Sequence, residues 1–339
     1  MIQTRTVTLP HGISLQCRES GSRGRPVLMF LHGFPEGAFI WDELLLHFAR
    51  PENGGYHCVA PYLRGFGESS QPQATEAYRA KHLVQDLVAL ISAVCTTGTV
   101  ECLVAHDWGG AVAWNLAAAR PELMQRLVII NSPHPQTFWR ELRQNPAQQA
   151  ASAYMNFLVR PDAEALLAEN DFARLWPFFD LMGASGAAAQ QQAAAALSDD
   201  AIGPGDAAQA LALPDGAGWM TDALRAQYRA VWTGDGSRPG AGLTGGLNYY
   251  RVSPLRPARE DDAAAAGVEL PPEAFTVKLP TLVLWAMQDS ALLPELLSGL
   301  QRWVPQMQLE RIERATHWVV HEQPARVAAS IQRFLGDDQ

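Results

Sequence analysis

The stretch that decides the fold reads Leu103-Val104-Ala105-His106-Asp107-Trp108-Gly109-Gly110. Its first half is apolar enough for a buried strand, and the residues after Gly110 have the composition of a helix. Asp107 lies between the small residues Ala105 and Gly109, as a tight strand-to-helix turn requires. Such a turn lifts its central side chain clear of the sheet, where a helix N-terminus favours an ionised carboxylate. Asp107 is therefore a candidate nucleophile, and the alternative is that it only caps the helix.

Strand and helix patterns alternate on both sides of this turn. The expected strands are residues 4–9, 13–18, 27–31, 56–60, 100–105, 127–130, 281–285 and 307–312. The expected helices between them are residues 40–49, 78–95, 109–120, 292–304 and 324–335. Strands that alternate with helices indicate a mostly parallel sheet covered by helices on both faces. The sequence therefore predicts an α/β fold with eight strands.

The alternation stops after residue 131, and no strand pattern follows until about residue 280. Residues 132–259 read as a helical, aromatic-rich insertion, which we expect to form a cap over a core made of residues 1–131 and 260–339. Within the insertion, residues 184–213 contain thirteen alanines in thirty positions. An Ala/Gln-rich stretch can form a helix but cannot pack a specific core, so we expect a surface excursion there.

Composition excludes several classes of protein. The chain has 339 residues, of which 47% are hydrophobic and 18% charged, so it is not disordered. Its net charge is −9 and it carries no dense run of Lys or Arg, which argues against a nucleic-acid or membrane partner. No apolar run at the N-terminus resembles a signal peptide, so the default location is cytoplasmic. The four cysteines have no metal-ligand spacing and read as buried thiols, and no glycine-rich phosphate loop is present.

Two further residues complete a catalytic pattern with Asp107. Asp289 comes just after the strand 281–285, and His317 lies in the loop between the last strand and the last helix. The chain order nucleophile, acid, histidine is that of the α/β-hydrolase triad. Loops at the carboxyl ends of parallel strands are where such sites assemble. A lone histidine is more often structural, but this order favours a catalytic role for His317.

The loop after the third strand reads Leu31-His32-Gly33-Phe34-Pro35-Glu36. A cis Phe34–Pro35 bond is expected to fix this turn. The backbone N–H groups of Phe34 and Trp108 are then candidates for an oxyanion hole. For His32 we prefer a structural role, in which the buried ring holds the loop.

These segments resemble the soluble epoxide hydrolases of the α/β-hydrolase fold. The resemblance rests on residues 32–35, on residues 106–110 and on His317-Trp318 with Glu322-Gln323-Pro324. It covers about residues 5–160 and 245–335. It implies a cofactor-independent enzyme that converts a hydrophobic epoxide to a vicinal diol. In this mechanism the nucleophilic Asp107 forms an alkyl ester, and His317 with Asp289 then hydrolyses it. No metal or cofactor is implied, and a homodimer is left open.

The resemblance also implies two ring-opening tyrosines in the cap. The segments Ala153-Tyr154-Met155-Asn156-Phe157 and Asn248-Tyr249-Tyr250-Arg251 match the family at Tyr154 and Tyr250. Tyr249 is the alternative to Tyr250 and otherwise lines the pocket. The alternative for all three is that they are core aromatics with bonded hydroxyls. The other expected pocket residues are Trp318, His134 and Phe157.

Two other functions stay open from the sequence. A haloalkane or haloacetate dehalogenase uses the same attack by Asp, and an indole N–H after the nucleophile, as in Trp108, can bind halide. In some dehalogenases the acid follows the sixth strand, but that position is Asn131 here. A non-catalytic ligand-binding protein on the same fold is the second alternative.

Overall fold

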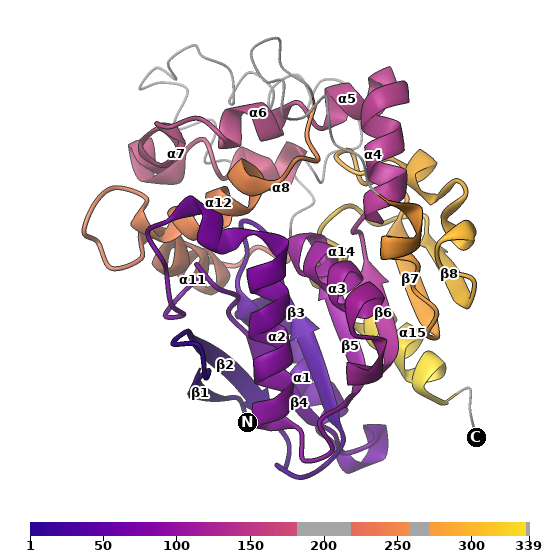
Figure 1. The fold of residues 1–339 in the computed structure, drawn as a ribbon. Coiled ribbons are helices and arrows are strands. Elements are labelled where there is room, and N and C mark those ends of the chain that lie inside the picture. The colour runs from indigo at the N-terminus through magenta and orange to yellow at the C-terminus, as the bar shows by residue number, and fades with distance from the viewer. Residues whose placement is uncertain (182–217, 258–270, 337–339) are drawn as a thin grey trace.

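A computed structural model describes residues 1–181, 218–257 and 271–336 of the chain (Figure 1). These residues form an eight-stranded sheet in the order β1-β2-β4-β3-β5-β6-β7-β8. The strands are β1 (Gln3–Thr8), β2 (Ser14–Ser20), β3 (Val27–Leu31), β4 (His57–Pro61), β5 (Val100–His106), β6 (Met124–Ile130), β7 (Thr281–Ala286) and β8 (Met307–Ile312). Only β2 runs antiparallel to the other strands, so the predicted mostly parallel α/β-hydrolase sheet is confirmed.

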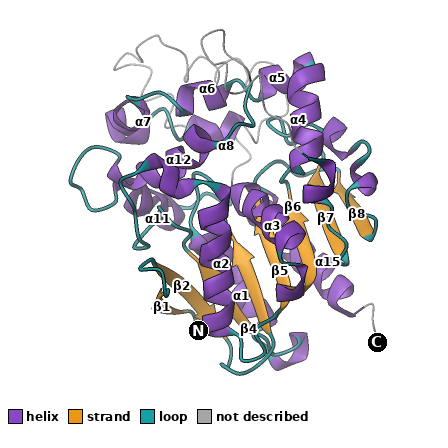
Figure 2. Cartoon of the chain, viewed as in Figure 1, coloured by secondary structure: helices purple, strands orange, loops and turns teal. Residues whose placement is uncertain are grey.

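Helices cover both faces of the sheet (Figure 2). They are α1 (Asp42–Phe48), α2 (Ala80–Val94), α3 (Asp107–Ala119), α14 (Val319–Glu322) and α15 (Pro324–Gly336). The helices α2 and α3 lie side by side on one face, and α1 and α15 lie on the other. Every residue of β3, β4 and β7 is buried, because these strands have cover on both faces and read as continuous apolar runs.

The helices between β6 and β7 lie over the carboxyl edge of the sheet, and we call them the cap (Figure 1). They are α4 (Pro135–Gln144), α5 (Pro146–Ala151), α6 (Tyr154–Leu158), α7 (Ala163–Phe172), α8 (Pro177–Leu181), α11 (Asp222–Thr233) and α12 (Thr244–Val252). The predicted division of the chain at residues 131 and 259 stays a prediction.

Aromatic side chains attach the cap to the core through hydrogen bonds to backbone oxygens. The Trp232 indole donates to the Pro35 carbonyl at 2.6 Å. At the foot of α12, the backbones of Gly245 and Gly65 lie so close that a Cβ on Gly245 would overlap Gly65. This close approach holds α12 against the turn after β4, and α12 carries both Tyr249 and Tyr250.

One expected helix is wrong. Residues 292–304 contain two short 3₁₀ helices, Pro294–Leu297 and Leu300–Arg302, instead of one long helix. Gly299 separates them with a φ of +70°, which a helix interior does not allow. The helix-like spacing of apolar residues in this segment therefore arises from two separate 3₁₀ helices, each of which buries its own leucine side chains.

Two other expectations concern composition. All four cysteines are buried and free, as predicted. No helix in the described part of the chain is long and apolar enough to cross a membrane. The Ala/Gln-rich stretch 184–213 lies outside the described residues.

Candidate active site

Asp107 sits at the junction of β5 and α3 with a φ of +50°, a left-handed conformation that costs energy for a residue with a side chain. Two glycines leave room for this turn, one in α3 and one in the loop after β3. A Cβ on Gly109 would overlap the carbonyl groups of Leu31 and His32, and a Cβ on Gly33 would overlap the Asp107 carboxylate. The chain therefore brings β5 and the loop after β3 closer together than side chains would allow.

Backbone N–H groups hold the Asp107 carboxylate in place. The N–H of Phe34 donates to Oδ1 at 2.8 Å, and the N–H of Trp108 also donates to this carboxylate. Burial raises the pKa of Asp107, while the nearby His317 and His106 and these two N–H groups act in the opposite direction. The two N–H groups named from the sequence as an oxyanion hole therefore meet at one side chain. The Phe34–Pro35 bond is cis, as expected.

His32 holds the loop that carries Phe34. Its Nδ1–H donates to the carbonyl of Gly33 at 2.9 Å, and its Nε2 accepts from the N–H of Leu63 at 3.1 Å. Burial lowers the pKa of His32 to about 4, so the ring is neutral at physiological pH. These contacts agree with the structural role preferred from the sequence.

His317 and Asp289 form a buried pair. Nδ1 of His317 lies 2.7 Å from Oδ2 of Asp289, and the Asp289 side chain is fully enclosed. The other Asp289 oxygen accepts from the backbone N–H groups of Ala291 and Leu292, each at 2.9 Å. Because Oδ2 faces Nδ1, the histidine presents its Nε2 to the rest of the site.

Nε2 of His317 points toward Asp107 at 3.8 Å from Oδ2, and it forms no hydrogen bond with any described residue. Burial tends to lower the pKa of His317, but the Asp289 and Asp107 carboxylates outweigh it and raise this pKa to about 9. The resting site therefore contains an imidazolium between two carboxylates at neutral pH.

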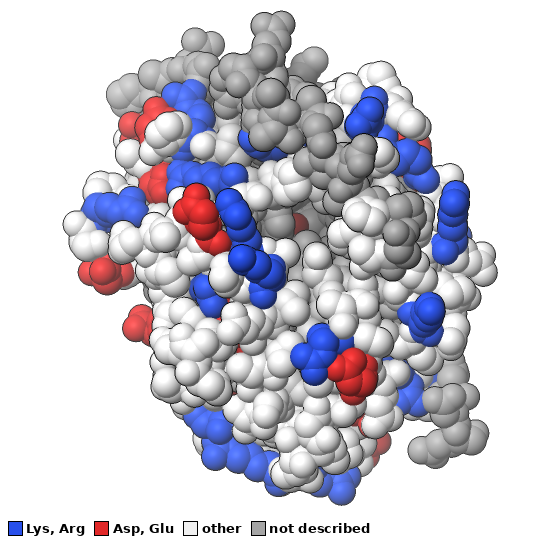
Figure 3. Space-filling view, in the orientation of Figure 1, with Lys and Arg blue, Asp and Glu red and all other residues white. Residues whose placement is uncertain are grey.

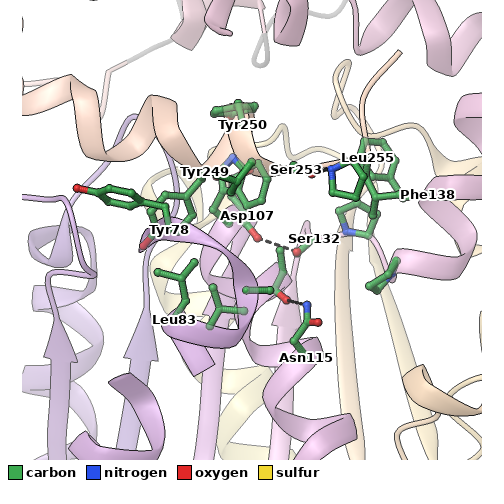
Figure 4. A pocket seen from close by; sticks show the side chains of 18 of the residues that line it. Tyr78, Leu83, Asp107, Asn115, Ser132, Phe138, Tyr249, Tyr250, Ser253 and Leu255 are labelled. Carbon is green, nitrogen blue, oxygen red and sulfur yellow. Dashed lines mark hydrogen bonds between the residues drawn. The ribbon is translucent and has the colours of Figure 1, made fainter. Parts of the chain in front are cut away.

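Tyr154 and Tyr250 come from different cap helices, and their ring centroids lie 6.4 Å apart. Figure 4 shows Tyr250 above Asp107. The ring of Trp108 packs edge-on against Tyr250, with the ring centroids 4.9 Å apart. Burial, followed by the negative charge of Asp107 and its surroundings, raises the pKa of both phenols. Both hydroxyls therefore keep their protons at neutral pH and are available as hydrogen-bond donors.

Tyr249 faces a different way. Its hydroxyl donates to the Arg64 carbonyl at 3.0 Å, and its ring packs edge-on against Trp108. It lines the cavity with its ring only. The geometry thus separates the two adjacent tyrosines, because the Tyr250 ring faces Tyr154 edge-on while the Tyr249 hydroxyl is bonded to the Arg64 carbonyl.

Asp107, Tyr154 and Tyr250 line one cavity of about 420 Å³ (Figure 4). The remaining lining is mainly apolar. It includes Leu83 on α2, Val112 on α3 and Phe138 on α4. A cavity of this size and polarity fits a small organic molecule with an apolar body.

Three expected pocket residues do not line this cavity among the described residues. Trp318 is wrong as a pocket residue because its indole donates to the Phe179 carbonyl at 2.9 Å, which places it between cap and core. His134 is wrong because it caps α4 and its Nε2 lies 2.8 Å from the Phe275 carbonyl. Phe157 is wrong because it is buried inside the cap, beneath Arg160.

Asn131 was missed as part of the site. Its Nδ2 donates to Oδ2 of Asp289 at 2.7 Å, and its Oδ1 accepts from the Ala286 N–H at 2.9 Å. Asn131 follows β6, Asp289 follows β7 and His317 follows β8, so Asp289 is held between Asn131 on one side and His317 on the other. Its position after β6, where some relatives place an acid, was the signal available in the sequence.

Glu36 was also missed, as the centre of a buried polar cluster behind His317. Its carboxylate accepts from the Tyr228 hydroxyl at 2.9 Å, and it lies 2.9 Å from Nε2 of His321 and 3.2 Å from Nδ1 of His106. Nε2 of His106 lies 3.0 Å from the carbonyl of His317. A charged residue inside an otherwise apolar loop was its only sequence signal.

Comparisons with known proteins agree with this geometry. The family described as alpha/beta hydrolase fold matches residues 26–324. The chain is 31% identical to the AB hydrolase superfamily protein YfhM of Bacillus subtilis, over 96% of this chain and 95% of that protein. It is 30% identical to Epoxide hydrolase A of Mycobacterium tuberculosis, again over 96% and 95%. A solved structure described among novel epoxide hydrolases in metagenomes from hot environments is 31% identical, with a TM-score of 0.75 over 99% of both chains.

Proposed function

Because the chain belongs to the epoxide hydrolases of the α/β hydrolase fold, we propose that it converts an apolar epoxide to a vicinal diol through an ester on Asp107. One observation carries the proposal. Two protonated phenols and one carboxylate face each other across a mainly apolar cavity. An epoxide needs a nucleophile at carbon and a proton donor at oxygen, on opposite sides of one C–O bond.

In the first step, an Asp107 oxygen attacks an epoxide carbon and the C–O bond breaks. Tyr154 and Tyr250 donate hydrogen bonds to the epoxide oxygen and supply its proton. Their raised pKa values keep both phenols protonated before this step. The product of the step is a hydroxyalkyl ester of Asp107.

In the second step, His317 removes a proton from water and the hydroxide attacks the Asp107 carbonyl. The ester C–O bond to the substrate then breaks, the imidazolium returns its proton to the departing alkoxide, and the Asp107 carboxyl group loses its proton to solvent as the diol leaves. Forming the ester removes the Asp107 charge, which is one cause of the raised pKa of His317. The pKa of His317 therefore falls as the ester forms. The ring releases its proton, which restores the phenol that protonated the epoxide oxygen, and the neutral ring can then accept a proton from water. The N–H groups of Phe34 and Trp108 stabilise the oxyanion, and Asp289 keeps the imidazole oriented.

The dehalogenase alternative has less support. A halide site at the indole of Trp108 needs open space beside its N–H, but the Tyr250 ring packs against this indole with the ring centroids 4.9 Å apart. Two buried phenols beside the carboxylate also have no task in displacing a halide.

The experiment that tests the ester mechanism uses isotopic water. A single turnover in oxygen-18 water is expected to place the label in Asp107 and none in the first diol. A second turnover in ordinary water then releases labelled diol. Label in the first diol contradicts the mechanism. Styrene oxide and a bromoalkane, assayed for diol and for bromide, separate the two enzyme classes, and binding without turnover of either supports a ligand-binding protein.

A cytoplasmic location and a homodimer stay predictions. Both follow from the sequence and its resemblance alone.

A further inference from the structure

Ser132 contacts the backbone of the nucleophile. Its Oγ donates a hydrogen bond to the main-chain carbonyl of Asp107 at 2.7 Å, and Figure 4 draws this bond. The residue is buried, with a relative exposure of 1%. It lines the cavity that opens through the hollow near the centre of the face shown in Figure 3. The bond therefore joins the loop after β6 to the first residue of α3, inside the active site.

A strained turn at the preceding residue allows this contact. Asn131 has a φ of +39°, a left-handed conformation that is uncommon for a residue with a side chain. The strand β6 lies between β5 and β7 in the sheet. The Asn131 side chain bonds to Asp289 after β7, and the Ser132 side chain bonds to Asp107 after β5. The turn thus lets two adjacent side chains support the acid and the nucleophile on opposite sides of β6.

Two neighbours hold Ser132 itself. Its carbonyl accepts a hydrogen bond from the Trp114 indole N–H at 3.2 Å. A Cβ on Gly110 would overlap the Ser132 side chain, so α3 approaches the hydroxyl more closely than any other residue type at position 110 would allow. The hydroxyl therefore acts from a fixed support.

The carbonyl that Ser132 holds belongs to the same peptide unit as the Trp108 N–H. A trans peptide unit is planar, so its C=O and N–H point in opposite directions. Fixing the direction of the Asp107 carbonyl therefore also fixes the direction of the Trp108 N–H. This N–H is one of the two that donate to the Asp107 carboxylate. A hydrogen bond accepted by the carbonyl also polarises the peptide and strengthens its N–H as a donor.

We propose that Ser132 is a positioning residue of the oxyanion hole, whose hydroxyl aims and strengthens the Trp108 N–H through the Asp107–Trp108 peptide. The proposal rests on the proposed function, because the oxyanion forms only when an ester on Asp107 is hydrolysed. Negative charge develops on the side-chain carbonyl oxygen of Asp107 in that step, so a well-aimed N–H lowers its barrier. Ester formation removes charge from the Asp107 carboxylate and gains nothing from a stronger donor.

The Ser132→Ala variant tests this by removing the hydroxyl without adding any atom. In single-turnover kinetics with styrene oxide, ester hydrolysis is expected to slow by about three- to tenfold. Ester formation is expected to keep its rate. The apparent pKa of the hydrolysis step is also expected to stay at the wild-type value, because His317 and Asp289 keep their contacts. A slower first step or a shifted pH profile overturns the assignment. Ser132→Cys, with a weaker S–H donor, is expected to lie between the two proteins.

The matched control is Ser330→Ala. Ser330 is also a buried serine, and its Oγ donates to Oε2 of Glu310 at 2.7 Å, on the far helix α15. Both rates are expected to equal those of the wild type. Slowing of ester hydrolysis in Ser330→Ala as large as in Ser132→Ala overturns a role that is specific to Ser132.

A spectroscopic signature tests the same contact without turnover. Asp107-Trp108 is the only Asp-Trp pair in the sequence, so labelling with carbonyl carbon-13 aspartate and nitrogen-15 tryptophan selects one amide signal. This signal is expected to move in Ser132→Ala and to stay in place in Ser330→Ala. An unmoved signal in Ser132→Ala overturns the positioning role, even in a protein that hydrolyses epoxides. A moved signal in a protein that hydrolyses no epoxide supports the positioning of this N–H while contradicting the proposed function.

Discussion

The imidazole of His317 lies between two carboxylates, with Nδ1 2.7 Å from Oδ2 of Asp289 and Nε2 3.8 Å from Oδ2 of Asp107. The first distance is a hydrogen bond and the second is too long for one. The ring is thus anchored on one side and faces the nucleophile on the other. This arrangement suits a base that acts on a water molecule beside the Asp107 ester, and not one that acts on Asp107 itself.

Replacing His317 by Gln is expected to stop the reaction after the first step. The nucleophile and the two tyrosines remain, so the ester still forms, but no base activates water for its hydrolysis. Intact-protein mass spectrometry after incubation with styrene oxide should show one added substrate mass on the chain. Peptide mapping should place it at Asp107. An unmodified, inactive protein contradicts the role assigned to His317.

The stability of the protein is expected to fall between pH 6.5 and pH 9. The folded pKa of His317 is about 9, above the unfolded value of about 6.5, so folding takes up a proton there. Its contribution to stability is fully present below about pH 6.5 and is lost as the pH rises through about 9. Urea unfolding across this range should show the decline, and the His317→Gln variant should show a smaller one. Identical profiles in the two proteins contradict the raised pKa.

Replacing Tyr154 or Tyr250 by Phe is expected to slow ring opening by about 100-fold, and replacing both should abolish it. Each change removes a phenol proton near the epoxide oxygen and leaves Asp107 and His317 in place. Stopped-flow measurement of the ester-forming step should therefore slow, and ester hydrolysis should keep its rate. The matched control is Tyr249→Phe.

Tyr249→Phe removes a hydroxyl that donates to the Arg64 carbonyl outside the cavity. We expect ring opening at close to the wild-type rate and a loss of about 1 kcal/mol in the free energy of unfolding. A loss of activity as large as that of Tyr250→Phe would contradict the assignment between the two adjacent tyrosines.

Replacing Asn131 by Ala is expected to impair the second step more than the first. Asp289 loses a donor and the Ala286 N–H loses its acceptor, both of them buried. The free energy of unfolding should decrease by about 1–3 kcal/mol. Single-turnover kinetics should show slower ester hydrolysis with nearly unchanged ester formation. Equal slowing of both steps contradicts a role through Asp289.

Replacing Gly33 by Ala is expected to remove activity with little change in the fold. The new Cβ would overlap the Asp107 carboxylate, so the nucleophile must leave its N–H donors. Circular dichroism should match the wild type, and no ester should form with styrene oxide. Gly98→Ala is a control for substitution at a glycine, because a Cβ there has open space, although its φ of +71° adds strain.

Much of the fold followed from residue patterns. The strand β3 has the expected bounds, because a buried apolar run with turn residues on each side leaves little choice. The strand β8 also has the expected bounds, although only its last residue is buried. The helix expected at residues 292–304 was wrong because apolar spacing records burial and not hydrogen bonding, and Gly299 interrupts the helix there. Trp318, His134 and Phe157 do not line the cavity, because Trp318 and His134 are hydrogen-bonded to backbone carbonyls elsewhere and Phe157 is buried inside the cap.

The sequence by itself determined the succession of strands and helices along the chain, the tight turn at Asp107 and the chain order Asp107, Asp289, His317. These are local properties, since a strand, a turn and a small residue each act over a few positions. Only the tertiary structure decided which tyrosine hydroxyl faces Asp107 and which polar groups support Asp289. Those facts depend on how distant segments pack together, because contacts between segments more than a hundred residues apart have no local signal in the chain.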